Sequence, residues 1–247
     1  MGKVGKMGAL NMQGKLFFAL ASVLLVGAAL WLGRGVAAES AVKIPAPAFD
    51  ASTPAAATET AVFAGGCFWG IQAVFQHTQG VVQAVSGYAG GDRASADYER
   101  VSSGRTGHAE SVQVTYDPRQ ISYGKLLQIY FSVAHDPTQL NRQFPDSGTQ
   151  YRSAIFYQDS NQKLIAERYI AQLDAAKAYP GKIVTQVSPL AAFYPAEAYH
   201  QDYATLHPES AYIATYDLPK LGYLKTLFPQ LYREAPVLVA QAKAGAK

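Results

Sequence analysis

The sequence predicts an α+β fold, in which helices pack on a mixed sheet on the two-layer, ferredoxin-like (split βαβ) plan. Between Thr60 and Arg233, short apolar or alternating segments typical of strands are interspersed with segments whose apolar residues recur at helical spacing. The first six of these elements follow the order β-α-β-β-α-β. The 247-residue chain is 49% hydrophobic and 16% charged, which is enough to bury the core of one domain with extensions.

The first elements follow one another closely. Residues 61–64 are a short apolar strand, and residues 67–77 carry apolar side chains on one helical face. Residues 81–85 form the next strand, followed by a glycine-rich loop that runs through Gly91. Residues 109–116 alternate strictly, as a half-buried strand does.

The later elements are longer and more widely spaced. Ser122 is expected to cap a helix that runs to about His135. Residues 153–157 form a strand, a long helix follows from Ser160 to near Tyr179, and residues 183–187 form the last strand. The irregular stretch between the two helices, residues 136–152, is long for a compact domain, and loops of this length are usually functional.

Residues 1–38 have the features of an export signal. They contain four basic residues and no acidic one, and residues 16–32 form an apolar run. We expect either cleavage near Ala38 or an uncleaved anchor, because 17 apolar residues are at the short limit for crossing a bilayer. In both cases the bulk of the protein is expected to be exported, as a soluble periplasmic domain or as one held at the membrane by residues 16–32.

The remaining chain divides by composition. Residues 39–59 are rich in Ala and Pro and predict a flexible linker, residues 60–233 form the folded domain, and residues 234–247 predict a flexible tail. Without the leader, 17 basic residues stand against 18 acidic ones, so the domain is near neutral. This balance excludes a basic nucleic-acid surface and makes a monomer the default.

Cys67 is the only cysteine, which excludes an internal disulfide and a CxxC redox pair. It lies in GGCFWG, between a strand and the first turn of a helix. The amide groups at that position are expected to lower the thiol pKa and make the sulfur nucleophilic. The alternative is an inert, buried thiol. Two adjacent aromatic residues, Phe68 and Trp69, cannot both point inward, so one of them is expected to form an apolar wall beside the sulfur.

Glu110 lies on the apolar face of the strand 109–116. Burial would raise the pKa of its carboxyl group and leave it protonated as a general acid, unless a bulge turns it to solvent. Tyr88 and Tyr151 are candidate hydroxyl donors, and Asp146 and Arg152 are candidate supports near Tyr151. The histidines form no ligand cluster and no nucleotide-binding motif is present, so we expect neither a metal nor another cofactor.

Six motifs then occur in a fixed order and together resemble the A-type peptide methionine sulfoxide reductases. They are GGCFWG (65–70), SGYAGG (86–91), TGHAESVQV (106–114), HDPTQLNRQ (135–143), DSGTQYRSAIFY (146–157) and AEAYHQDY (196–203). The resemblance covers about residues 60–205.

The resemblance implies thiol-dependent reduction of methionine (S)-sulfoxide, free or in proteins, and so the repair of oxidised proteins. Cys67 would attack the sulfoxide sulfur and become a sulfenic acid. Glu110 would protonate the oxygen, assisted by Tyr88 and Tyr151, with Asp146 near the site. Phe68 and Trp69 would hold the substrate's methyl group.

Two features depart from the family pattern. The resolving cysteine of many relatives is missing, so an external thiol such as thioredoxin or glutathione would have to reduce the sulfenic acid. Phe144 stands where a glycine is expected, in the loop before Asp146. Two other functions remain open on the residues alone: a thiol peroxidase, and a binding module that recognises oxidised methionine without turnover.

Overall fold

The computed structural model describes residues 1–2, 40–50 and 57–239. Apart from the first two, these residues belong to one compact unit, Ala38–Lys247. The signal or anchor expected in residues 1–38 therefore lies almost entirely outside the described residues. Within the described ranges, none of the helices has the length and apolar character needed to span a bilayer.

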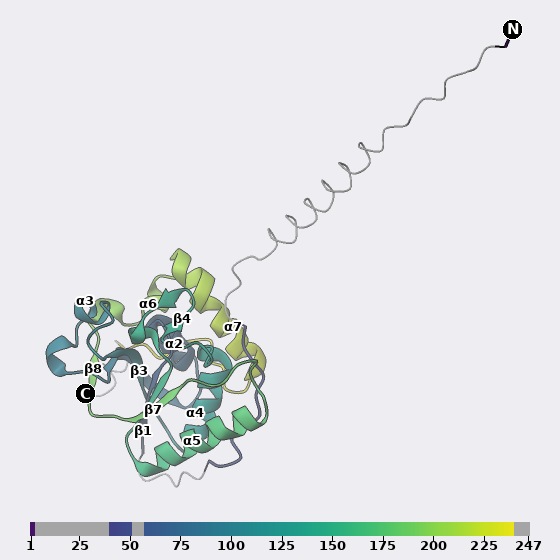
Figure 1. Ribbon diagram of the computed structural model, residues 1–247. Coiled ribbons are helices and arrows are strands. Elements are labelled where there is room, and N and C mark those ends of the chain that lie inside the picture. Colours follow the sequence, from purple (N-terminus) through teal and green to yellow (C-terminus); the bar gives the residue numbers. More distant parts are fainter. Residues whose placement is uncertain (3–39, 51–56, 240–247) are drawn as a thin grey trace. The chain divides into compact units, whose positions relative to one another are not determined.

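A six-stranded sheet forms the centre of the domain (Figure 1). Its strands follow the order β7-β6-β1-β3-β2-β8. The strands are β1 (Glu59–Ala64), β2 (Val81–Ala89), β3 (Ala109–Tyr116), β6 (Ala154–Tyr157), β7 (Gln186–Pro189) and β8 (Phe193–Pro195). All neighbours are antiparallel except β6 and β7, which run parallel. The α+β class and the mixed sheet with helices packed on it are thus confirmed.

Two crossover connections build the centre of this sheet. β1 leads through α2 (Phe68–Gln76) to β2, and β3 lies between these two strands. β3 leads through α4 (Tyr123–Ile129) to β6, which pairs with the far side of β1. The split βαβ plan covers these four strands only. The edge strand β7 follows α5 (Ser160–Ala175), whereas β8, at the other edge, was not expected.

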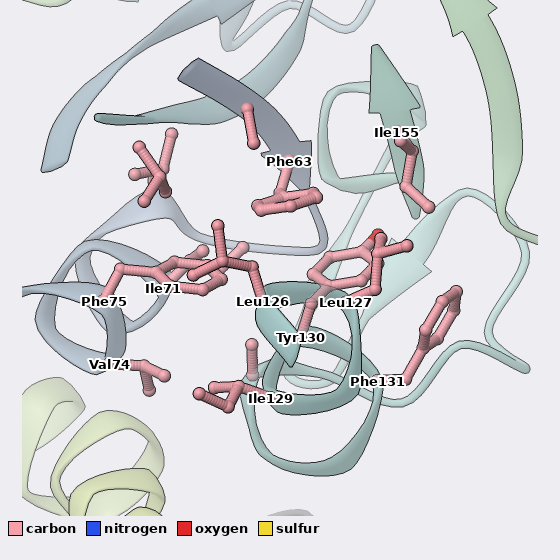
Figure 2. Packing of buried hydrophobic residues seen from close by; sticks show 14 of the residues in the cluster. Phe63, Ile71, Val74, Phe75, Leu126, Leu127, Ile129, Tyr130, Phe131 and Ile155 are labelled. Carbon is pink, nitrogen blue, oxygen red and sulfur yellow. The ribbon is translucent and has the colours of Figure 1, made fainter. Parts of the chain in front are cut away.

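The main core lies between the sheet and helices α2, α4 and α5. Phe63 of β1 stacks on Phe75 of α2 at 5.3 Å between ring centres and on Tyr130, just after α4, at 5.0 Å (Figure 2). The residues on either side of Phe63, Val62 and Ala64, point to the opposite face of β1 and join a second, smaller cluster. The sheet is therefore buried on both faces around β1, the strand that leads into Cys67.

Several elements differ from the sequence expectation. β2 continues to Ala89 rather than ending at Val85, so the expected glycine-rich loop begins only after it. A π-helical turn, Tyr130–Ala134, follows α4. The long loop holds a hairpin of β4 (Arg142–Gln143) and β5 (Asp146–Ser147). The helices α3 (Tyr98–Val101), α6 (Tyr203–Leu206) and α7 (Leu218–Leu227) were not expected.

The described parts of the two expected flexible segments contact the domain. In residues 40–50, Ile44 is buried, and its carbonyl accepts a hydrogen bond of 3.0 Å from the Gln128 side chain. In the C-terminal segment, the Val239 backbone N–H donates to the Asp202 carboxylate at 3.1 Å. Residues 40–50 and 234–239 are thus packed segments, and Glu59, at the end of the expected linker, already belongs to β1. Residues 39, 51–56 and 240–247 lie outside the described residues.

Candidate active site

A cavity of about 210 Å³ opens beside Cys67, where the β1–α2 turn meets the start of β3 and the long loop. Six of the seven site residues named from the sequence line it. The lining residues are Cys67, Phe68, Trp69, Tyr98, Glu110, Asp146, Tyr151 and Tyr212. Residues separated by as many as 145 positions in the sequence are therefore brought to one small site.

The β1–α2 turn presents the Cys67 thiol to this cavity. Cys67 is the residue immediately before α2 and is partly exposed. Gly66 has a φ of +96°, and a side chain there would approach Gln143 Cγ to 2.6 Å. Only glycine combines this backbone conformation with so close a neighbour. The chain can thus turn sharply from strand to helix with the sulfur at the bend.

The pKa of the Cys67 thiol is raised, which corrects the sequence expectation. Burial in the cavity is the main cause, and the nearby carboxyl groups of Glu110 and Asp217 raise it further. The backbone N–H of Trp69 lowers it, as expected at a helix start, but this is the smaller effect. The thiol form of Cys67 is therefore favoured over the thiolate.

Glu110 faces the thiol from β3. Its side chain is 2% exposed, and its Oε2 accepts a hydrogen bond of 3.1 Å from the Phe68 backbone N–H. Burial raises the pKa of Glu110 to about 8, although that hydrogen bond lowers it. The alternation of β3 placed this carboxyl on the buried face, and the structure has it there. The group is therefore mostly protonated at neutral pH and can donate a proton.

Phe68 and Trp69 form the apolar wall of the cavity. Phe68 is fully buried, whereas Trp69 is only partly buried. This agrees with the expectation that two adjacent residues of a helix cannot both point inward. The Trp69 ring stacks on Tyr203 of α6 at 3.9 Å between centres. Among described residues its Nε1–H has no hydrogen-bond partner. The Trp69 ring is thus fixed by its stacking on Tyr203, and both Phe68 and Trp69 line the cavity.

Asp146 and Tyr151 come from the long loop. Asp146 begins β5 in the β4–β5 hairpin, and its Oδ2 accepts a hydrogen bond from the Tyr212 hydroxyl. Burial raises the pKa of Asp146, while the Tyr212 hydrogen bond and the charge of Lys220 lower it. Burial likewise raises the pKa of Tyr151, which keeps its hydroxyl proton. Both side chains can therefore contribute polar contacts at the cavity wall.

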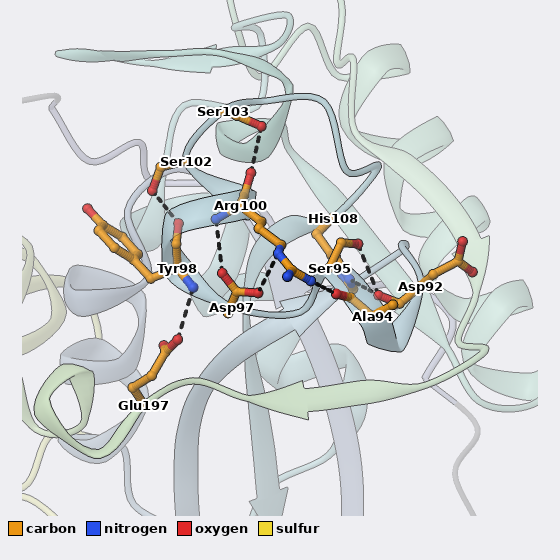
Figure 3. A network of polar contacts seen from close by, with 10 residues as sticks. All are labelled: Asp92, Ala94, Ser95, Asp97, Tyr98, Arg100, Ser102, Ser103, His108 and Glu197. Carbon is orange, nitrogen blue, oxygen red and sulfur yellow. Dashed lines mark hydrogen bonds and ion pairs between the residues drawn. The ribbon is translucent and has the colours of Figure 1, made fainter.

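Tyr88 does not line the cavity, contrary to the sequence expectation. Because β2 extends to Ala89, Tyr88 is fully buried in the sheet, and its hydroxyl donates to Glu197 Oε2 at 2.9 Å. The other oxygen of Glu197 accepts from the Tyr98 backbone N–H at 3.0 Å (Figure 3). Tyr88 and Tyr98 thus share Glu197 as an acceptor, and Tyr98 lines the cavity where Tyr88 was expected.

Sequence reasoning missed Tyr98 and Tyr212. Tyr98 begins the four-residue helix α3, which is too short to show helical periodicity. The one local signal is Asp97, whose side chain caps that helix by accepting from the Arg100 N–H at 3.1 Å. Tyr212 precedes a π-helical turn, Ile213–Asp217, far along the chain, and no pattern links it to Cys67.

His135 and His200 are buried but are not among the residues that line the cavity. Burial lowers the pKa of His135 to about 3, and its Nε2 lies 2.7 Å from the Ser153 hydroxyl. His200 is buried among the rings of Phe68, Trp69 and Tyr98. In the part of the chain that the structure describes, no three or more His, Cys, Asp or Glu side chains group as a metal site would require.

The sequence is similar to those of known proteins over most of its length. The family model "Peptide methionine sulfoxide reductase" matches residues 59–228. The chain is 63% identical over 185 residues to peptide methionine sulfoxide reductase MsrA 2 of Mesorhizobium japonicum, covering 75% of this chain and 95% of that protein. It is 50% identical over 199 residues to a protein of the same name from Synechocystis, covering 79% and 93%.

The chain belongs to the peptide methionine sulfoxide reductase family.

Solved structures agree with this family assignment. Methionine sulfoxide reductase A of Corynebacterium diphtheriae is 38% identical with a TM-score of 0.54, over 69% of this chain and 85% of that one. Reduced Mxr1 of Saccharomyces cerevisiae is 32% identical with a TM-score of 0.59, over 67% and 94%. Membership makes the chain a peptide-methionine (S)-S-oxide reductase, which is an oxidoreductase, and its substrate a methionine sulfoxide.

Proposed function

We propose that the protein repairs oxidised proteins by a single-cysteine mechanism centred on Cys67 and Glu110. The supporting observation is the pairing of a thiol with a buried carboxyl group, both lining one small cavity. The carboxyl has a pKa of about 8, so it is available as a proton donor at neutral pH. An apolar wall beside the sulfur suits the methyl group that a methionine sulfoxide carries.

In the first step, Cys67 Sγ attacks the sulfoxide sulfur while Glu110 donates its proton to the sulfoxide oxygen. The hydroxyls of Tyr98 and Tyr151 hold that oxygen, and Phe68 with Trp69 holds the methyl group. The thiol proton replaces the one that Glu110 gave. The oxygen is then transferred to Sγ, so that methionine leaves with two more electrons and Cys67 remains as a sulfenic acid.

This coupling explains how a thiol of raised pKa can react. Burial, and to a smaller extent the carboxyl groups of Glu110 and Asp217, disfavours a free thiolate at Cys67. When proton donation to the oxygen accompanies attack by sulfur, the thiol loses its proton only as the sulfoxide gains one. The site therefore does not have to hold a thiolate beside the carboxyl groups before substrate arrives.

In the second step, an external thiol regenerates the enzyme. The chain has no second cysteine to attack the sulfenic acid. Two thiol groups of a reductant, such as a thioredoxin or two glutathione molecules, would yield the Cys67 thiol, a disulfide in the reductant, and water. The basic, apolar residues 1–38 support an exported or membrane-held location, where secreted proteins would be the substrates.

A single-turnover experiment tests this proposal. Reduced protein is mixed with a peptide carrying methionine (S)-sulfoxide and no added thiol. We expect about one methionine per protein molecule, together with a sulfenic acid that a mass tag traps on Cys67. The matched controls are the (R)-sulfoxide peptide and the Cys67→Ser variant, and both should give no methionine.

Two results would overturn the proposal. Full activity of Cys67→Ser would remove the cysteine from the mechanism, and a preference for the (R)-sulfoxide would contradict the family assignment of specificity. Hydrogen peroxide serves as the competing oxidant in a parallel assay. Turnover of peroxide that exceeds turnover of sulfoxide by orders of magnitude would identify a thiol peroxidase instead.

A further inference from the structure

A continuous row of aromatic rings leads from the cavity wall to the protein surface. Trp69 lies edge to face with Tyr212 at 6.0 Å between ring centres. Tyr212 contacts Tyr216 at 5.1 Å, and Tyr216 lies edge to face with Phe144 at 5.8 Å. We call these four residues the aromatic strip. Its inner half, Trp69 and Tyr212, lines the cavity, so the strip is a continuation of the site already described.

The outer end of the strip is exposed but held in place. Phe144 lies at the turn of the β4–β5 hairpin and is 37% exposed. Its backbone N–H donates to Gln139 Oε1 at 3.0 Å. The hairpin also carries Asp146, which accepts from the Tyr212 hydroxyl. The ring of Phe144 is therefore presented to solvent on a fixed support next to the site.

The cavity itself is too small to enclose a peptide. Its volume of about 210 Å³ lies below the roughly 300–1,000 Å³ of pockets that enclose whole small ligands. It can take one oxidised side chain, so the neighbouring residues of a polypeptide substrate have to lie on its rim. Successive residues of an extended chain are about 3.3 Å apart, so each ring-to-ring step of the strip, 5.1–6.0 Å, corresponds to about two residues.

We propose that the outer half of the aromatic strip, Tyr216 and Phe144, binds an apolar side chain a few residues from the methionine sulfoxide in an unfolded polypeptide. This inference rests on the function proposed above and specifies its substrate. Such chains expose the apolar residues that a folded protein buries, and ring faces bind apolar groups through burial of surface. The enzyme would thus act best on oxidised segments taken from protein cores, and less well on the free amino acid.

The test compares substrates rather than total activity. The kcat/KM is measured for N-acetyl-methionine (S)-sulfoxide and for short peptides whose residues beside the sulfoxide are either Leu and Phe or Ser and Gly. For the unaltered protein we expect about a tenfold preference for the apolar peptide over the polar one, which is the ratio that 1.4 kcal/mol provides. In Phe144→Ala and in Tyr216→Ala this preference should largely disappear.

Two measurements separate a loss of substrate recognition from a loss of the hairpin's structure. Because Asp146 lies on the same hairpin as Phe144, unchanged kcat/KM for the N-acetyl substrate shows that the hairpin keeps its structure. The matched control is Leu164→Ala on α5, which removes a side chain of similar exposure, 38%, that the strip does not include. This variant should keep both the N-acetyl activity and the preference for the apolar peptide.

Three results would contradict the inference. Equal kcat/KM for apolar and polar peptides in the unaltered protein would remove the subsite. An equal loss on all substrates in both Phe144→Ala and Tyr216→Ala would assign the strip a structural role only. Failure of the unaltered protein to reduce even the N-acetyl substrate would instead refute the proposed function on which the subsite depends.

Discussion

At Glu110, the burial that keeps a proton on the carboxyl group also reduces the stability of the fold at neutral pH. The folded state holds this proton up to a pH of about 8, whereas the ordinary pKa of a glutamate side chain is 4.5. Between these values the folded protein binds more protons than the unfolded chain, so the free energy of unfolding falls as pH rises. The stability associated with Glu110 is full below pH 4.5 and is lost as pH approaches 8.

The variant Glu110→Gln separates these two effects. Its single-turnover rate should fall by about 10² to 10⁴, because the positioned acid is lost. Its free energy of unfolding at pH 8 should exceed that of the unaltered protein by up to a few kcal/mol, with little difference near pH 4.5. Urea unfolding at both pH values measures the second effect. An unchanged single-turnover rate would show that another group donates the proton.

The sequence located most of the candidate site because local patterns placed those residues. GGCFWG put Cys67 at a strand-to-helix turn, and strict alternation put Glu110 on the buried face. Tyr88 was misplaced because Gly87 resembles a loop residue. In the structure, a side chain at Gly87 would approach the Tyr194 carbonyl oxygen of β8 to 2.3 Å. That glycine therefore allows close strand pairing, a long-range contact that no local pattern shows.

At the scale of elements, the turn between β1 and α2 determines where the sulfur lies. Gly66, directly before Cys67, is one of the six glycines with positive φ among the described residues. A methyl group there would have to displace Gln143, a buried residue of the hairpin that carries Asp146. A change at this position would therefore disturb the thiol and the hairpin together.

We expect Gly66→Ala to lower the free energy of unfolding by about 1–3 kcal/mol and to reduce the single-turnover rate as well. The control is Gly222→Ala in α7, where an added methyl group meets no atom within 4 Å. In a helix interior that change should be neutral or stabilising by up to about 1 kcal/mol. Equal stability and rate for Gly66→Ala and the unaltered protein would show that the turn tolerates a side chain.

Elements with clear periodicity were the ones that sequence analysis could predict. Strands β1 and β3 and helices α2 and α5 appear within a few residues of their expected positions. α3 and α6 have four residues each, so they contain about one turn and show no repeat. Their positions depend on tertiary contacts, such as the ring of Trp69 stacked on Tyr203.

At the scale of the whole molecule, residues 40–50 contribute to the fold although their composition resembles that of a linker. The Asp50 carboxylate accepts a hydrogen bond of 2.9 Å from the Gly124 backbone N–H and another from the Ser122 hydroxyl, at the start of α4. The Tyr169 hydroxyl of α5 donates to the Pro45 carbonyl at 2.7 Å. Ala and Pro residues predicted flexibility, but here the Pro45 carbonyl accepts from α5 and the Asp50 carboxylate accepts from the start of α4.

We expect Asp50→Ala to lower the free energy of unfolding by about 1–2 kcal/mol, because α4 loses an acceptor at its positive end. Asp92→Ala is the control, since Asp92 is exposed and its side chain makes no capping hydrogen bond. Thermal or urea unfolding of the two variants gives the comparison. If both variants unfold like the unaltered protein, the hydrogen bonds of Asp50 add nothing to the stability of the domain.

The single thiol at the turn before α2 also allows the oxidation state of the protein to be measured directly. Since Cys67 is the only thiol in the sequence, any thiol-directed dye or isotope tag labels that position and no other. Every labelled copy was reduced at the moment of quenching, and every unlabelled copy was already modified there. A mass spectrum of the intact protein would therefore give the fraction of enzyme molecules with a reduced and with an oxidised Cys67, whichever reductant is supplied.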